Sequence, residues 1–277
     1  MRDLELVADD AWPAALDLLG AGRETREALT GGYTAWWLAR HARLGGHRPG
    51  HWRLPSATAL AALYDEAPTR APRDPDSREV VWRAIGVRGD LTVADATEAA
   101  DLLARLADPA RHPDVALVAD AHVALTEAVA AGRVHPADLD APEHVRALDG
   151  SVVSVDVAVV LDAPWPASVL SAGELVAGGD PAGLADLLDL PPATDVVAGG
   201  VAGAGKAVAW AAVAEVVVAC HTLGVDVPVG DLLLHDELWV ALARPVTGRF
   251  RVPVWPDGHG AWHAEDPVRA LLALLAE

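Results

Sequence analysis

Apolar residues in the first half of the chain recur at every third or fourth position, which is the spacing of helices with one buried face. Residues 9–19 are predicted to form a helix because Asp9 or Asp10 can cap it and Pro13 lies in the first turn. The same spacing predicts helices in TAWWLARHARL (34–44) and SATALAALYDEA (56–67), and a helical block from 77 to 132. We therefore expect a helical N-terminal half.

From about residue 144 the pattern changes to short runs of β-branched residues separated by turn residues. Two such runs flank Asp149-Gly150, a dipeptide typical of tight hairpins. Further strands are expected in LLLHDELWVALA (232–243) and in RFRVPVWPDGHGAWHA (249–264), which contains a Pro-Asp-Gly turn. The second half is therefore expected to form a sheet.

Two helices are expected among these strands, in DPAGLADLLDLP (180–191) and in DPVRALLALLAE (266–277). In the second of them Asp266 is the predicted cap and Pro267 the first helical residue. The whole pattern predicts an α+β protein, with a helical N-terminal half followed by a mixed, mainly antiparallel sheet with helices.

The best linker candidate is APTRAPRDPDSR (67–78), because it holds three prolines among mostly polar residues. With the change of pattern near residue 144, it divides the chain into three expected parts. These are a helical segment (1–75), a second helical block (76–143) and an α+β domain with hairpins and a C-terminal helix (144–277).

Composition narrows the class of partner. The formal net charge of −19 would repel nucleic acids and anionic membranes, so neither is expected as a partner, and it suits solubility in the cytosol. The single cysteine, Cys220, suits a reducing compartment. The N-terminus lacks the apolar core of a secretory signal, and the longest apolar run (207–220) is shorter than the roughly 20 residues of a membrane span. We expect a cytoplasmic protein.

The stretch GGVAGAGKAV (199–208) has Gly200, Gly205 and Lys206 at the spacing of a phosphate-binding loop. Such a loop also needs a Ser or Thr after the lysine to bind magnesium, and Ala207 stands there instead. The preferred interpretation is a glycine-rich turn that joins two paired strands, with the lysine in solvent. The alternative is a nucleotide-binding protein that uses these three residues.

Other candidate chemistry is weaker. His259 and His263 could bind zinc on a helix, but a turn and strand pattern separates them, so both are expected to be solvated. His47 and His51 lie in a loop-rich segment that is poorly suited to a fixed metal site. Of Trp36-Trp37, one ring is expected to fill the core and the other to half-cover a neighbouring helix. We expect that the chain binds no metal, has no catalytic residues and is not an enzyme.

Several phrases resemble a known family. TAWWLARHARLGGHRP, ALAALYDEAP, VWRAIGVRGDL, VRALDGSVVSVDVAVVLDAPW, LADLLDLPPATDVVAGGV and LLHDELWV follow the order seen in the C-terminal, non-ATPase region of bacterial sacsin-like proteins. These proteins are relatives of the heat-shock chaperones that begin with a GHKL-type ATP-binding domain. The resemblance covers roughly residues 34 to 277.

The resemblance implies a non-catalytic scaffold or protein-interaction region of a chaperone-related ATP-binding protein. Its partner would be a client protein or its own ATPase module. The family's ATP and magnesium site belongs to the GHKL domain, whose Glu/Asn helix motif and Asp-x-Gly-x-Gly turn do not occur in this sequence. No cofactor is therefore expected on this chain, which is expected to be a fragment or a free-standing version of the non-ATPase region.

Overall fold

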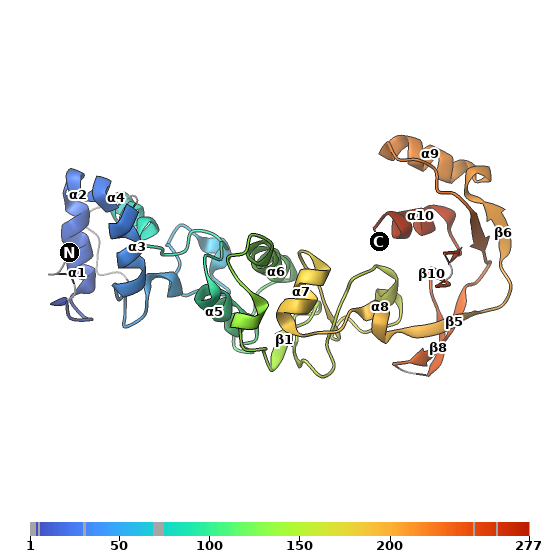
Figure 1. The fold of residues 1–277 in the computed structure, drawn as a ribbon, viewed down its shortest axis with the longest axis horizontal. Coiled ribbons are helices and arrows are strands. Elements are labelled where there is room, and N and C mark those ends of the chain that lie inside the picture. The colour runs from blue at the N-terminus through green and yellow to red at the C-terminus, as the bar shows by residue number, and fades with distance from the viewer. Residues whose placement is uncertain are drawn as a thin grey trace. The chain divides into compact units, whose positions relative to one another are not determined.

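A computed structural model describes residues 4, 6–29, 32–68, 75–245, 247–258 and 260–276, without the side chains of 75–78. The chain forms two compact units, Met1–Asp140 and Ala141–Glu277, here called the N-terminal and C-terminal units. Helices dominate the first and mostly antiparallel sheets the second, so the protein is α+β as the sequence predicts (Figure 1). No helix in the described ranges is long and apolar enough to cross a membrane.

Six α-helices lie in the described part of the N-terminal unit. They are α1 (Trp12–Ala21), α2 (Arg23–Leu29), α3 (Gly32–His41), α4 (Pro75–Ala84), α5 (Ala96–Leu106) and α6 (Val115–Ala130). The first four pack around an apolar cluster that includes Trp12, Trp37 and Trp82. Asp95 and Asp114 cap α5 and α6, because each side chain accepts a hydrogen bond from an amide in the first turn.

Two expectations for the N-terminal unit change. The helix predicted for residues 56–67 is wrong, since only a 3-10 turn forms at Thr58–Leu60. The segment instead folds back on Arg53, whose amide donates to the Asp65 carbonyl and whose carbonyl accepts from the Ala67 amide. The predicted linker, 67–78, overlaps the start of α4 at Pro75, and its residues 69–74 lie outside the described ranges.

The described residues of the C-terminal unit form short strands and four α-helices. The strands are β1 (His144–Arg146), β2 (Val152–Ser154), β3 (Val159–Val160), β4 (Leu175–Val176), β5 (Ala198–Ala202), β6 (Lys206–Ala209), β7 (Asp231–Leu234), β8 (Trp239–Arg244), β9 (Gly248–Arg251), β10 (Val254–Pro256) and β11 (Trp262–Ala264). The helices are α7 (Pro181–Leu188), α8 (Ala193–Val196), α9 (Ala214–Leu223) and α10 (Pro267–Leu275).

The strands form a four-stranded sheet in the order β10-β11-β7-β6, a three-stranded sheet β5-β8-β9 and two smaller pairs. Only β11–β7 and β3–β4 are parallel. The hairpin predicted around Asp149-Gly150 is confirmed, because β1 and β2 are antiparallel and Gly150 has a φ of 85°. Asp266 accepts hydrogen bonds from the amides of Val268 and Arg269, so the predicted cap of α10 is also confirmed.

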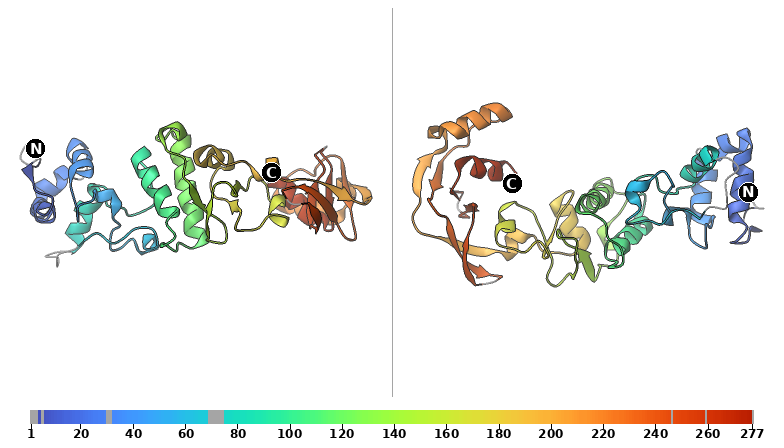
Figure 2. Two further views of the ribbon diagram at one scale, coloured as in Figure 1. Left: turned by 90° about the horizontal axis from the view of Figure 1, so that it is seen from below. Right: turned by 180° about the vertical axis from the view of Figure 1, so that it is seen from behind.

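A large apolar cluster joins the two larger sheets of this unit to α9 and α10. It contains four tryptophans, and Trp165 and Trp255 meet edge to face with ring centroids 4.6 Å apart. Figures 1 and 2 show α9 and α10 near one another beside the strands, and the two helices pack together. This packing leaves part of α9 outside the cluster.

The paired strands predicted across residue 204 are not present. β5 pairs with β8, and β6 pairs with β7, so the two strands belong to different sheets. Val201 of β5 lies opposite Val240, and Val208 of β6 lies opposite Leu232. The glycine-rich segment is therefore a connection between sheets, turned by Gly203 with a φ of 109°.

Candidate functional site

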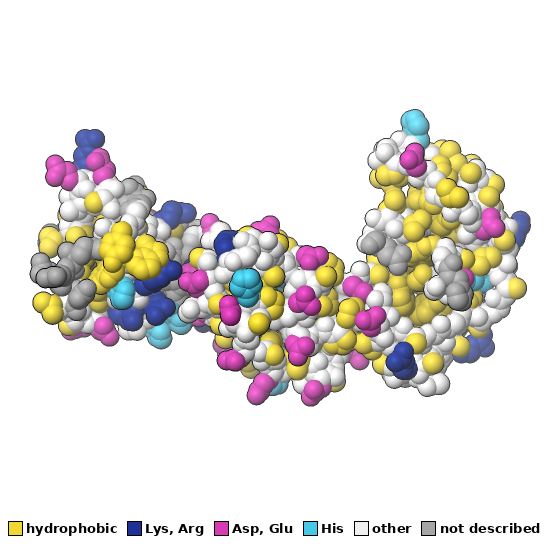
Figure 3. All heavy atoms as spheres, in the orientation of Figure 1, with side chains coloured by type: hydrophobic (Ala, Val, Ile, Leu, Met, Phe, Trp, Pro, Cys, Tyr) yellow, Lys and Arg dark blue, Asp and Glu magenta, His cyan; other side chains and the backbone are white. Residues whose placement is uncertain are grey.

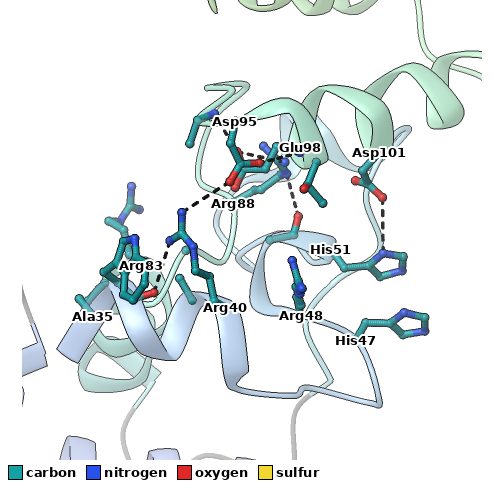
Figure 4. A pocket seen from close by; sticks show the side chains of 17 residues that line it. Ala35, Arg40, His47, Arg48, His51, Arg83, Arg88, Asp95, Glu98 and Asp101 are labelled. Atoms are coloured by element: carbon teal, nitrogen blue, oxygen red, sulfur yellow. Dashed lines mark hydrogen bonds and ion pairs between the residues drawn. The ribbon is translucent and has the colours of Figure 1, made fainter. Parts of the chain in front are cut away.

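The N-terminal unit has a pocket of about 470 Å³, here called the cationic pocket. One wall comes from α3 and the turn that follows it, and the facing wall from the end of α4 and the start of α5 (Figure 4). Its charged and aromatic lining consists of Trp36, Arg40, His47, Arg48, His51, Arg83, Arg88, Asp95, Glu98 and Asp101. Most of these residues lie in sequence segments far apart from one another.

Buried Arg88 joins two loops beneath the cationic pocket by hydrogen bonds. Its Nε donates to the Gly50 carbonyl at 2.8 Å, and its Nη1 donates to the Thr92 carbonyl at the same distance. The guanidinium therefore satisfies carbonyl groups of two loops that have no strand partner there. Its Nη2 lies 3.6 Å from Glu98, whose carboxylate also accepts from the Ala94 amide.

Arg105 is the second buried arginine of this unit. It donates to the Leu63 carbonyl at 2.9 Å and to the Asp101 carboxylate at 2.8 Å. Its Nη2 lies 2.7 Å from Nδ1 of His51. Because a guanidinium can only donate, this Nδ1 accepts and His51 is neutral. Burial, followed by the charge of Arg105, lowers the pKa of His51 accordingly, so the 3.7 Å approach of Asp101 to this ring is not an ion pair.

The acids of the pocket are already engaged. Asp95 caps α5 and lies 3.6 Å from Arg40, while Glu98 and Asp101 face Arg88 and Arg105. The two remaining guanidiniums differ. Arg48 and Arg83 are both exposed and have no hydrogen bond or ion pair to any residue that the structure describes. In Figure 4 Arg40 lies between Arg83, which comes from α4, and Arg48, and the guanidinium of Arg40 faces Asp95.

Of the two adjacent tryptophans, one is buried in the core, as the sequence predicts. Trp37 is buried in the core of the N-terminal unit, whereas Trp36 is 48% exposed. Trp36 lines the cationic pocket instead of covering a neighbouring helix. The guanidinium of Arg40 lies over its ring, 4.4 Å from the centroid, and this cation–π contact holds both side chains at the pocket wall.

The C-terminal unit exposes an apolar surface on α9. Within the helix only Val216 and Cys220 are buried, while Val217, Val218 and Leu223 are 39, 65 and 52% exposed. Val225 and Val229, just beyond α9, and Leu272 and Leu275 on α10 are also exposed. We call these seven side chains the α9 surface. Hydrophobic side chains gather on this unit in Figure 3.

The predicted glycine-loop residues have other roles. Gly200 lies within β5 and Lys206 is the first residue of β6, so a strand and not a helix follows the lysine. A phosphate loop needs a helix N-terminus at that point. Gly205 packs against His235, where a Cβ atom would come within 2.5 Å of the ring nitrogen Nε2. A close approach of backbone to imidazole therefore accounts for this glycine.

A pair of histidines lies beside Gly205. Nε2 of His235 is 2.9 Å from Nδ1 of His263, so one ring donates to the other. Burial lowers the pKa of both groups, and the proximity of His235 lowers that of His263 further. The prediction of a solvated histidine is wrong for His263, which is 8% exposed; His259 lies outside the described residues. No group of three or more metal-ligating side chains occurs in the described ranges.

Sequence reasoning missed both surfaces. Arg48 and Arg83 stand in unrelated segments, and only the fold brings them to one pocket. In the sequence, the residues of α9 form only part of a long apolar run, which does not predict an exposed helix. Gly224, with a φ of 69°, is nevertheless a typical helix-ending signal. Comparisons with protein-family models, with curated proteins and with solved structures found no match. Function is therefore inferred from the chain's own residues.

Proposed function

We propose that this chain is a non-catalytic protein-interaction region of the sacsin-like, chaperone-related kind, which acts in the cytoplasm by holding a client protein. The resemblance of residues 34–277 to that family supports the proposal. The observation that carries it is the α9 surface, a group of exposed apolar side chains on and near α9, beside a well-packed core. Exposed apolar patches are typical of protein-binding surfaces.

The charge around the α9 surface indicates which client would bind. Glu215 lies on α9, and Asp226 and Asp231 follow the helix, in a chain that carries a net charge of −19. An apolar centre with an acidic rim complements a client that exposes apolar side chains among Lys and Arg. The client that we expect on the α9 surface is therefore a non-native, basic protein.

Suppression of client aggregation tests this proposal. Lysozyme and α-lactalbumin share a fold but have opposite net charges, and both aggregate once their disulfides are reduced. The full-length protein is expected to suppress the aggregation of reduced lysozyme, measured by light scattering, more strongly than that of reduced α-lactalbumin. Added salt is expected to narrow the difference, because it screens the charged rim.

A double variant of α9 tests the surface itself. Val217→Asp with Val218→Asp places two charges on the apolar face and is expected to abolish most of the suppression. Val157→Asp is the matched control, since Val157 is 54% exposed in the same unit but lies outside α9. Circular dichroism verifies that both variants fold. Equal suppression by the α9 variant and the control would contradict the proposal, as would no suppression by the unmodified chain.

A further inference from the structure

The cationic pocket carries positive charge that its own acids do not neutralise. Its three carboxylates face Arg40, Arg88 and Arg105. No carboxylate of the pocket, as far as the structure describes its residues, faces Arg48 or Arg83. Both are exposed guanidiniums with no partner among the described residues. Two uncompensated arginines at one pocket, in a chain with a net charge of −19, attract an anion of about two charges.

The pocket is larger than an inorganic anion requires. Its volume of about 470 Å³ falls in the range of small-molecule sites. Ala35, Ala39 and Ala84 supply apolar lining, and the half-exposed ring of Trp36 adds a flat wall. The ligand therefore has an organic part as well as a charged one.

The start of α5 favours phosphate over carboxylate. Thr97, in the first turn of α5, lines the pocket and can donate its hydroxyl to a phosphate oxygen. Guanidiniums bind phosphate through paired N–H groups. The two carboxylates at the start of α5, Asp95 and Glu98, already lie beside Arg40 and Arg88.

From this arrangement we propose that the cationic pocket binds a small organic phosphate. Arg48 and Arg83 supply the charge that attracts the phosphate, and Arg40 lies between them (Figure 4). The organic part lies against Trp36 and the neighbouring alanines. Arg88, His51 and Arg105 keep the two walls together and do not contact the ligand. This site is independent of the α9 surface and of client binding.

Calorimetric titration of the full-length protein near pH 8 tests this proposal, with phenyl phosphate, inorganic phosphate and succinate as probes at constant ionic strength. Phenyl phosphate is expected to bind with a dissociation constant below about 1 mM. Arg48→Gln and Arg83→Gln are each expected to weaken it at least tenfold, because each removes a charge-assisted hydrogen bond. Arg133→Gln, at an exposed arginine of the same unit outside the pocket, is expected to change nothing.

A second variant separates the two parts of the ligand. Trp36→Ala is expected to weaken phenyl phosphate but leave inorganic phosphate unchanged. Three results would overturn the proposal: no saturable binding of phenyl phosphate, binding by the Arg48/Arg83 double variant equal to that of the unmodified protein, or succinate binding as tight as phenyl phosphate. The two arginines are exposed and unpartnered, so their replacement leaves the fold intact, which thermal unfolding verifies.

Discussion

The two units of this protein are stabilised in different ways. The C-terminal unit has two sizeable sheets whose backbone groups pair with one another around a large apolar cluster. The part of the N-terminal unit that the structure describes has no such sheet, and several of its loop carbonyls are satisfied by the buried guanidiniums of Arg88 and Arg105. Where a segment lacks a strand partner, an arginine side chain can supply the missing donors. The N-terminal unit is therefore the more sensitive of the two to the loss of a single charge.

Replacing Arg105 is expected to have the largest effect. Arg105→Ala leaves the Leu63 carbonyl without its donor and Asp101 without its cation, which should cost about 3–5 kcal/mol of unfolding free energy. Hydrogen exchange measured by mass spectrometry is expected to show the loss of protection in the N-terminal unit alone. Equal loss in both units would show that the comparison between them is wrong.

Alkaline pH is expected to weaken the same unit. Burial raises the pKa of Tyr64 to about 12, against the opposing effect of Arg88. The raised pKa stabilises the fold below the unfolded value of 10, and this contribution is lost as the pH rises through 12. Over that window the N-terminal unit should lose up to about 3 kcal/mol, measured by denaturant unfolding at each pH.

Tyr64→Phe is the control for this experiment. The ring lies between the guanidiniums of Arg88 and Arg105, 4.8 and 4.3 Å from its centroid, and phenylalanine keeps these contacts. The buried hydroxyl has no hydrogen-bond partner among the described residues, so its removal at neutral pH should not destabilise the protein. The variant should lose less stability than the unmodified chain above pH 10. Parallel losses in both proteins would exclude Tyr64 as the cause.

The smallest expected effect lies in the C-terminal unit. Gly205→Ala forces a methyl group to within 2.5 Å of the His235 ring and should cost about 2 kcal/mol. Gly200→Ala is the matched control, because a Cβ atom there meets nothing within 4 Å. Thermal unfolding of the double variant with His235→Ala should recover part of the loss. A phosphate loop would instead make both glycine variants equally harmful.

The sequence predicts those parts of the fold that depend on local signals. Asp95, Asp114 and Asp266 stand before periodic apolar residues and cap their helices, and Gly150 turns the first hairpin. It does not predict strand partners that lie far apart in the chain. The apolar run from Ala207 to Cys220 has no clear period, so the change from β6 to α9 within it is decided by tertiary packing.

The candidate sites follow the same division. That one of the two adjacent tryptophans would be buried could be inferred from the amphipathic pattern, and the structure shows that it is Trp37. The pairing of Arg48 with Arg83 at one pocket could not, because neither residue belongs to a local motif. The neutral state of His51 also depends on a distant residue, Arg105, which approaches it only in the folded chain.

The position of β11 within its sheet has a consequence for biosynthesis. β11 is the last strand along the chain, yet it lies between β10 and β7 and is not at an edge. During translation β6 and β7 can form their antiparallel ladder early, but the far side of β7 stays open until Trp262–Ala264 emerges from the ribosome. The C-terminal unit therefore completes its fold only after residues 262–264 have been synthesised.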